Sequence, residues 1–209
     1  MNLAKKNITP KGKLVACQAV ARLAITTNPV MAFPGQQTYE AIKCLLVLLK
    51  QEQQVDRSSL MNFEALMALT NIASIDEGHR NKITTTPEMV YCIESLALED
   101  HELIRRAAVQ LICNLLMCQK YRDLYKESVE KDQTCDRLKL LILMCQEDDD
   151  ETRSAAAGAL ATLTCYKKFE NLFFKKIFTK FLSRYFQTHF ITQNIVNESN
   201  KLPKHGNSV

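Results

Sequence analysis

The sequence contains no hydrophobic run long enough to cross a membrane. A membrane-spanning helix needs about 18 to 20 consecutive apolar residues, and the 209-residue chain has no such run although 46% of its residues are hydrophobic. The N-terminal residues MNLAKKNITPKGK also lack the apolar segment of a secretion signal. We therefore expect a cytosolic protein with an ordinary globular composition.

Patterns typical of common enzymes are missing as well. There is no phosphate-binding G-x-x-x-x-G-K-[ST] loop, and the four histidines lie in unrelated segments that predict no catalytic triad. The segment HELIR at 101–105 begins like the zinc-protease pattern H-E-x-x-H, but Arg105 occupies the position of the second histidine. We expect neither enzymatic activity nor a cofactor.

Two further features allow a metal site but favour structural roles. The eight cysteines form no C-x-x-C pair and mostly lie in apolar segments, so we expect buried thiols rather than disulfides or zinc ligands. The acidic run EDDDE at 147–151 suits either a metal or the positive end of a helix, and the helix start is preferred. Arg105 and Arg106 are expected to pair with nearby acids such as Glu102.

The net charge of +4 is unevenly distributed. Residues 166–209 contain seven lysines and one arginine against two glutamates, so the first 165 residues carry a net charge of −2. Proteins that bind nucleic acid through a broad surface need clustered lysine and arginine to displace counterions. We therefore expect no nucleic-acid partner for the main domain.

Four segments of similar pattern recur along the chain. The best matched are FEALMALTNIAS at 63–74 and RAAVQLICNLLM at 106–117, which align Asn71 with Asn114. Measured at this asparagine position, the four copies are 49, 43 and 48 residues apart, close to the period of about 40 to 47 in armadillo and HEAT repeats. The other copies are VACQAVARLAIT at 15–26, with Arg22 at this position, and SAAAGALATLTC at 154–165, with Thr162 there.

A second apolar helix is predicted between successive copies, and strand patterns are nearly absent. The sequence thus predicts an all-α, armadillo-like, right-handed superhelical solenoid of three to four repeats. Residues Thr86, Asp100 and Asp148 are expected to cap helices that follow them. The predicted second helices span 39–51, 87–98 and 136–146, and short first helices are predicted at 78–84 and 121–128.

The repeated helices predict a partner-binding groove. Each residue of a helix turns by 100°, so Glu64, Ala68 and Asn71 form one stripe, and stacked repeats would align such stripes along the concave face. An asparagine there can hold the main chain of an extended partner, or it can tie one repeat to the next. The candidate groove residues are Arg22, Glu64, Asn71, Asn114, Thr162 and Tyr166.

Short blocks of sequence also resemble one protein family. In unbroken order over residues 11–168, the chain is similar to the UCS domain of the myosin chaperones related to the nematode uncoordinated protein. The resemblance implies an armadillo-type domain that binds the myosin motor domain, assists its folding and works with the ninety-kilodalton heat-shock chaperone. The blocks include ITTNP at 25–29, FEALMALTN at 63–71, HELIRRAA at 101–108, EDDDE at 147–151 and AAAGALATLT at 155–164.

The chain departs from this family at both ends. The tetratricopeptide repeats that hold the heat-shock chaperone in animal members do not precede Lys11, which puts that docking in doubt. Beyond residue 168 the sequence no longer matches further armadillo units, so we expect a truncated or alternatively ended product. Such a product could occupy myosin without recruiting the heat-shock machinery.

The remaining sequence predicts a basic aromatic tail. Residues 169–193 form an amphipathic helical pattern that could cap the solenoid, remain poorly folded, or bind a membrane or a calmodulin-like partner, and membrane binding is not favoured. The alternative function is a generic armadillo scaffold that this tail directs to a membrane or to a calmodulin-like partner. The predicted organisation is a flexible segment at 1–10, the armadillo domain at 11–168, the helical tail at 169–193 and a disordered end at 194–209.

Overall fold

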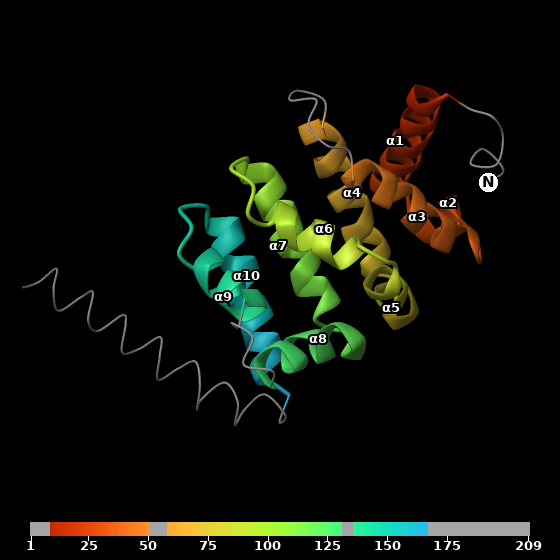
Figure 1. The fold of residues 1–209 in the computed structure, drawn as a ribbon. Helices are drawn as coiled ribbons and strands as arrows, with labels where there is room; N and C mark the ends of the chain where they lie inside the picture. The colour runs from red at the N-terminus through yellow and green to blue at the C-terminus, as the bar shows by residue number, and fades with distance from the viewer. Residues whose placement is uncertain (1–8, 51–57, 131–135, 167–209) are drawn as a thin grey trace, which may run out of the picture. The chain divides into compact units, whose positions relative to one another are not determined.

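The computed structural model describes residues 9–50, 58–130 and 136–166, and every regular element within them is an α-helix (Figure 1). No helix in these ranges is long and apolar enough to cross a membrane. The predicted tail helix and disordered end lie outside the described residues. The helices are α1 (Pro10–Thr26), α2 (Pro29–Ala32), α3 (Gln37–Leu49), α4 (Ser58–Ala73), α5 (Glu77–Thr85), α6 (Met89–Leu96), α7 (Glu102–Leu115), α8 (Gln119–Glu130), α9 (Asp136–Met144) and α10 (Asp150–Thr164).

The chain divides into two compact units, Met1–Leu163 and Thr164–Val209. Within the first unit, the four repeated segments form helices α1, α4, α7 and α10, as the sequence predicts. Helix α4 packs between α1 and α7, which places successive copies side by side (Figure 1). Helices α3, α6 and α9 are the predicted second helices, and α5 and α8 the short first helices. The fold is an armadillo-like helical solenoid.

Burial of the repeated helices shows what stacking contributes to the fold. Helix α4 is buried along most of its circumference because neighbours cover two of its sides. Stacking therefore removes apolar surface that an isolated unit would expose to water, at roughly 1.5–3 kcal/mol for each large aliphatic side chain. The fully buried residues of α4 are Ala65, Leu66, Ala68, Leu69, Ile72 and Ala73.

Three predicted helix caps are wrong. Thr86 ends α5 instead of starting α6, because its hydroxyl donates a 2.7 Å hydrogen bond to the Lys82 carbonyl. Helix α6 begins only at Met89, after a turn in which Glu88 has the left-handed φ of 64°.

The other two errors are displacements by one residue. The residue before α7 is His101, not Asp100, and no side chain caps that helix. At α10, Asp149 rather than Asp148 accepts the Thr152 amide at 3.0 Å. Two adjacent acidic residues predict a helix cap equally well from the sequence. Only the geometry of the turn decides which carboxylate accepts hydrogen bonds from the free amides at the start of the helix.

The cysteines show less burial than the sequence predicts. Cys17 and Cys118 are buried, but Cys165 is exposed, and all seven described cysteines are free thiols. Cys118 donates a 2.8 Å hydrogen bond to the side-chain oxygen of Asn81, which fixes the start of α8 to α5.

Candidate partner-binding surface

The first two candidate groove residues meet where α1 packs on α4. Arg22 Nε and Gln18 Nε2 each donate a 2.8 Å hydrogen bond to the carboxylate of Glu64. Glu64 is only 9% exposed, whereas the Arg22 side chain is 59% exposed. A carboxylate that loses water needs such donors to offset its desolvation. Glu64 is therefore covered by α1, and Arg22 is the member of the pair that faces solvent.

Asn71 connects the same two helices. Its Nδ2 donates a 3.1 Å hydrogen bond to the Ala24 carbonyl, and its side chain is half-buried. Of the two roles that the sequence allows, this geometry realises the tie between repeats. The amide oxygen of Asn71 still has acceptor capacity, so the tie does not use the whole side chain.

The later candidate residues have different surroundings. Asn114 is half-buried on α7, and its side chain forms no hydrogen bond with any residue that the structure describes. Thr162 donates a 2.9 Å hydrogen bond to the Gly158 carbonyl of its own helix. Tyr166 belongs to the second compact unit. The structure thus brings Arg22, Glu64 and Asn71 to one junction.

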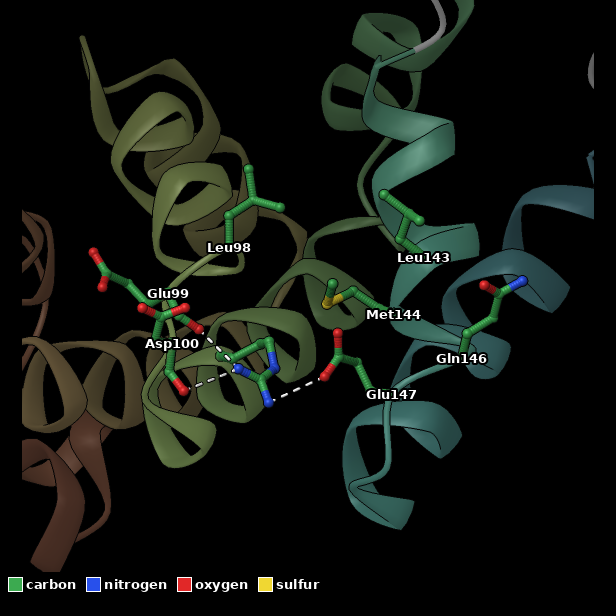
Figure 2. A pocket seen from close by; sticks show the side chains of 8 residues that line it. Leu98, Glu99, Asp100, Leu143, Met144, Gln146 and Glu147 are labelled. Carbon is green, nitrogen blue, oxygen red and sulfur yellow. Dashed lines mark hydrogen bonds and ion pairs between the residues drawn. The ribbon is translucent and has the colours of Figure 1, made fainter.

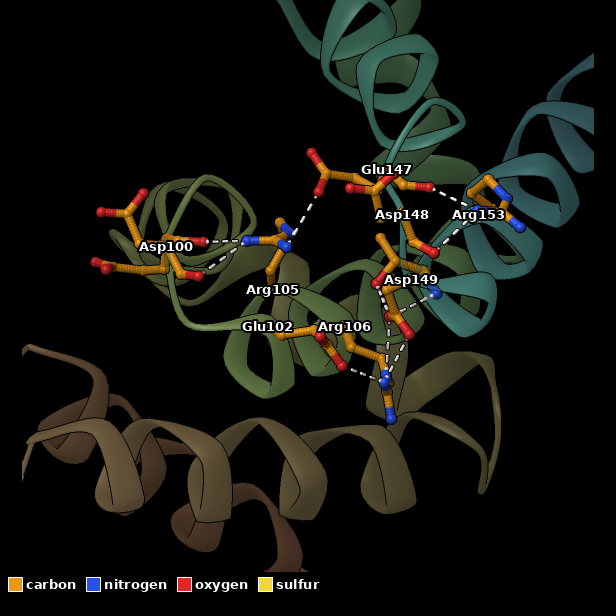
Figure 3. Close-up of polar contacts among 10 residues, drawn as sticks. Asp100, Glu102, Arg105, Arg106, Glu147, Asp148, Asp149 and Arg153 are labelled. Atoms are coloured by element: carbon orange, nitrogen blue, oxygen red, sulfur yellow. Dashed lines mark hydrogen bonds and ion pairs between the residues drawn. The ribbon is translucent and has the colours of Figure 1, made fainter.

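Sequence reasoning missed an arginine clamp between α7 and α10 (Figure 3). Arg106 donates to both carboxylate oxygens of Asp149, at 2.9 Å from Nε and 2.6 Å from Nη2, and also contacts Glu102 at 2.7 Å. The predicted pairing of Arg106 with Glu102 is therefore confirmed, but the stronger, bidentate contact spans 43 residues.

Asp149 serves two helices at once. Its carboxylate accepts the amide and hydroxyl of Thr152 at the start of α10 while it holds Arg106. The hydrogen bonds from Arg106, followed by those from Thr152, hold the pKa of Asp149 well below its usual range. The predicted helix-start role of the EDDDE run is therefore confirmed: Asp149 caps α10, and Asp150 and Glu151 lie in its first turn.

Arginines one repeat apart close equivalent turns. Arg105 Nη1 donates to the Glu99 and Asp100 carbonyls at 2.8 and 3.2 Å, and Arg153, 48 residues later, donates to the Glu147 and Asp148 carbonyls at 2.9 and 3.0 Å. Both guanidinium groups donate hydrogen bonds to backbone carbonyl groups in the turn that precedes their own helix. Arginine at matching repeat positions was the sequence signal for this role.

A second arginine pair closes the ends of the repeated helices. Arg80 Nη1 donates to the Ala73 carbonyl at the end of α4, and Arg122 Nη1 donates to the Leu116 carbonyl just after α7, each at 2.8 Å. A cation at these carbonyls also interacts favourably with the negative end of the helix dipole. Most described arginines therefore hold the solenoid together instead of forming a free basic surface.

A pocket of about 440 Å³ opens between the α6–α7 turn and the α9–α10 turn (Figure 2). Arg105 lines this pocket and contacts Glu147 at 3.1 Å. Leu98 and Leu143 line opposite sides, while no described group of three or more histidines, cysteines or acids could hold a metal ion. The lining residues are Leu98, Glu99, Asp100, Arg105, Leu143, Met144, Gln146 and Glu147.

Comparison with known proteins identifies the family. No family model matches the chain. The chain is 43% identical over 160 residues to protein unc-45 homolog B of Danio rerio, a match that covers 77% of this chain and 16% of the relative. The solved structure of UNC-45 from Drosophila melanogaster superposes with a TM-score of 0.66 at 43% identity, over 75% of this chain and 18% of that chain. The chain is a partial member of the UNC-45 family.

A second solved structure of the UNC-45 family adds a functional description. It is 31% identical, covers 81% of this chain and 18% of that chain, and has a TM-score of 0.65. It is described as the UNC-45 chaperone, with features critical for binding and folding muscle myosin. The present chain spans about one sixth of the length of its curated UNC-45 relatives. The family resemblance and the solenoid fold predicted from the sequence are confirmed.

Proposed function

We propose that this chain is a myosin-directed co-chaperone module that binds the myosin motor domain. The observation that carries the proposal is its 43% identity over 160 residues to an UNC-45 relative, together with the solved UNC-45 chaperone described as binding and folding muscle myosin. In the described repeats, most of the polar side chains discussed above hold one repeat to the next or close a turn. A stack of helices built in this way is compatible with a binding role. We further propose a cytoplasmic, non-enzymatic protein and, as the family resemblance implies, a link to the ninety-kilodalton heat-shock chaperone.

The proposed contact surface follows α1, α4, α7 and α10. Arg22 supports it because Glu64 fixes Nε while no described residue hydrogen-bonds to the two terminal nitrogens of the guanidinium. A partner carbonyl or carboxylate could accept from these nitrogens without a large loss of side-chain entropy. Asn114 adds an amide with no hydrogen-bonding partner among the described residues.

Asn71 and Thr162 complete the described part of this surface in a lesser role. Both already make hydrogen bonds within the solenoid, so each offers a partner only its remaining capacity. Glu64 acts by positioning Arg22, since its own carboxylate is nearly buried. Tyr166 stays a proposed partner contact on the second unit.

The experiment is suppression of heat-induced aggregation of a purified myosin motor domain, followed by light scattering. We expect the chain to slow aggregation and Asn114→Ala to weaken this protection. The substitution should not lower the melting temperature of the chain, because the Asn114 side chain makes no hydrogen bond to a residue that the structure describes. Gln36→Ala is the matched control, since this exposed residue precedes α3 and its side-chain amide makes no cap hydrogen bond.

Two outcomes would overturn the proposal. The chain could fail to protect the motor domain although circular dichroism shows it folded. Alternatively, protection could vanish on removal of residues 169–209 and survive combined Asn71→Ala and Asn114→Ala substitutions. The second result would favour a scaffold targeted by its tail instead of a groove.

A further inference from the structure

The pocket between the α6–α7 and α9–α10 turns exposes two leucine side chains. Leu98 is 62% exposed and Leu143 is 53% exposed, and they face the same hollow from different repeats (Figure 2). Met144, at 3% exposure, supplies a buried apolar wall beside Leu143. The hollow has a volume of about 440 Å³. Apolar anchors of a partner would therefore find both space and contact surface here.

The rim of this pocket is acidic. Segments 98–106 and 143–153 contain eight carboxylates against three guanidinium groups. Arg105, Arg106 and Arg153 are each engaged by carboxylates of these same segments. Glu99 and Asp100 lie exposed at the pocket, and neither carboxylate forms an ion pair with a described residue. The unpaired charge at the rim is therefore negative.

From this combination we infer that the pocket docks a basic amphipathic helix of a partner protein. An apolar side chain such as leucine would enter between Leu98 and Leu143, and flanking lysines or arginines would meet Glu99 and Asp100. Helix-in-groove recognition uses apolar anchors at helical spacing, and complementary charge favours the correct partner and speeds its association. The inference uses residues other than the proposed myosin groove and does not depend on it.

Two alternative occupants lack this match. An acidic segment would be repelled by Glu99 and Asp100, and a neutral apolar segment would leave both carboxylates without a counter-charge. Arg105 does not attract an acidic occupant, because its terminal nitrogens already hold the Glu99 and Asp100 carbonyls and the Glu147 carboxylate.

The test is fluorescence anisotropy of a labelled synthetic helix of leucine and lysine against the full chain. We expect saturable binding that weakens at least about tenfold when the salt concentration rises from about 0.05 to 0.5 M, because the rim charges are exposed to screening. Combined Glu99→Lys and Asp100→Lys substitutions should weaken binding by about tenfold or more, and Leu143→Ser by a similar factor. All three residues are exposed, so the variants should keep the wild-type circular dichroism melt.

Matched controls separate the pocket from general charge and hydrophobicity. Glu77→Lys changes an exposed acid in α5, and Met31→Ser removes an apolar side chain that is 82% exposed in α2. Both should leave the affinity within about twofold of wild type. A second peptide in which glutamate replaces every lysine should bind at least about tenfold more weakly. The inference is overturned if this acidic peptide binds equally well, or if the pocket variants bind like the controls.

Discussion

Helices α4 and α10 are repeats of one sequence pattern but are held in the solenoid by different forces. Helix α4 is packed on both sides and buries large aliphatic residues such as Leu69 and Ile72. The buried residues of α10 are Thr152, Ala156, Ala159 and Leu163, of which one alone is a large aliphatic. The polar clamp between Arg106 and Asp149 lies at the start of α10, the helix that buries few large apolar side chains.

The comparison shows how small side chains change the balance of interactions. The small residues of α10 include Gly158, where an added Cβ would lie at the ordinary van der Waals distance of 3.6 Å from Cys113 Sγ of α7. They also remove less apolar surface from water than leucine or isoleucine would. Position within the stack is therefore fixed at α4 mainly by packing, and at α10 with a larger share from hydrogen-bonded charge.

The largest expected effect is a cavity in the central helix. Leu111 of α7 is fully buried, so Leu111→Ala should lower the free energy of unfolding by about 2–5 kcal/mol. Urea denaturation followed by circular dichroism measures this change. Leu103→Ala, on the same helix but 42% exposed, is the control and should cost much less. Equal losses for the two variants would show that α7 is not the packed centre of the stack.

The next effect concerns the start of α10. Asp149→Ala removes the helix cap and the partner of Arg106, and should lower the free energy of unfolding by about 0.5–2 kcal/mol. Asp148→Ala changes the adjacent exposed acid and should stay within about 0.5 kcal/mol of wild type. If the control is the more damaging substitution, the clamp is assigned to the wrong carboxylate.

A smaller effect of opposite sign is expected at Gly158. A methyl group there would meet Cys113 at an ordinary van der Waals distance, so Gly158→Ala should raise stability by about 0.5–1 kcal/mol through helix propensity. Gly35→Ala is the contrasting variant, because Gly35 has a left-handed φ of 61° and alanine there should be destabilising. Thermal unfolding of both variants checks the signs, and a destabilising Gly158→Ala would mean that the contact of the added methyl group with Cys113 costs more than the gain in helix propensity.

The smallest effect is a pH dependence. The pKa of Asp149 is lowered in the folded chain, so its charge stabilises the fold above its unfolded pKa of about 3.9, and this contribution is lost as the pH falls below that value. Asp149→Asn keeps a capping oxygen but cannot titrate. The stability difference between wild type and this variant should therefore shrink between about pH 5 and pH 2 in urea titrations. A constant difference would assign the effect of Asp149 to its shape instead of its charge.

The helix pattern was predictable because apolar residues recur with the helical period in every repeat. Helical geometry also placed Glu64, Ala68 and Asn71 on one stripe. It did not indicate that α1 covers Glu64, since the contact between two helices depends on their offset and not on either sequence alone. The candidate groove residues could therefore be assigned to the repeated helices from the sequence, but they could not be divided into exposed and buried residues.

Turns and long-range ion pairs were beyond the reach of local patterns. Thr86 and Pro87 form a typical helix-start pattern. In the structure, however, the Thr86 hydroxyl donates its hydrogen bond to the Lys82 carbonyl at the end of α5. Arg106 and Asp149 pair only because two successive repeats pack against each other. Local helix rules do not predict that packing. The repeated arginines at 105 and 153 did carry a signal, visible when the aligned repeats are compared for polar as well as apolar positions.

The most direct test of the proposed function is amide hydrogen exchange of the chain with and without a myosin motor domain. The account predicts that binding slows exchange in peptides from the four helices that carry the proposed contact surface, α1, α4, α7 and α10, which span Pro10–Thr26, Ser58–Ala73, Glu102–Leu115 and Asp150–Thr164. Slowed exchange confined to residues 169–209, or no change under conditions where the two proteins bind, would contradict it.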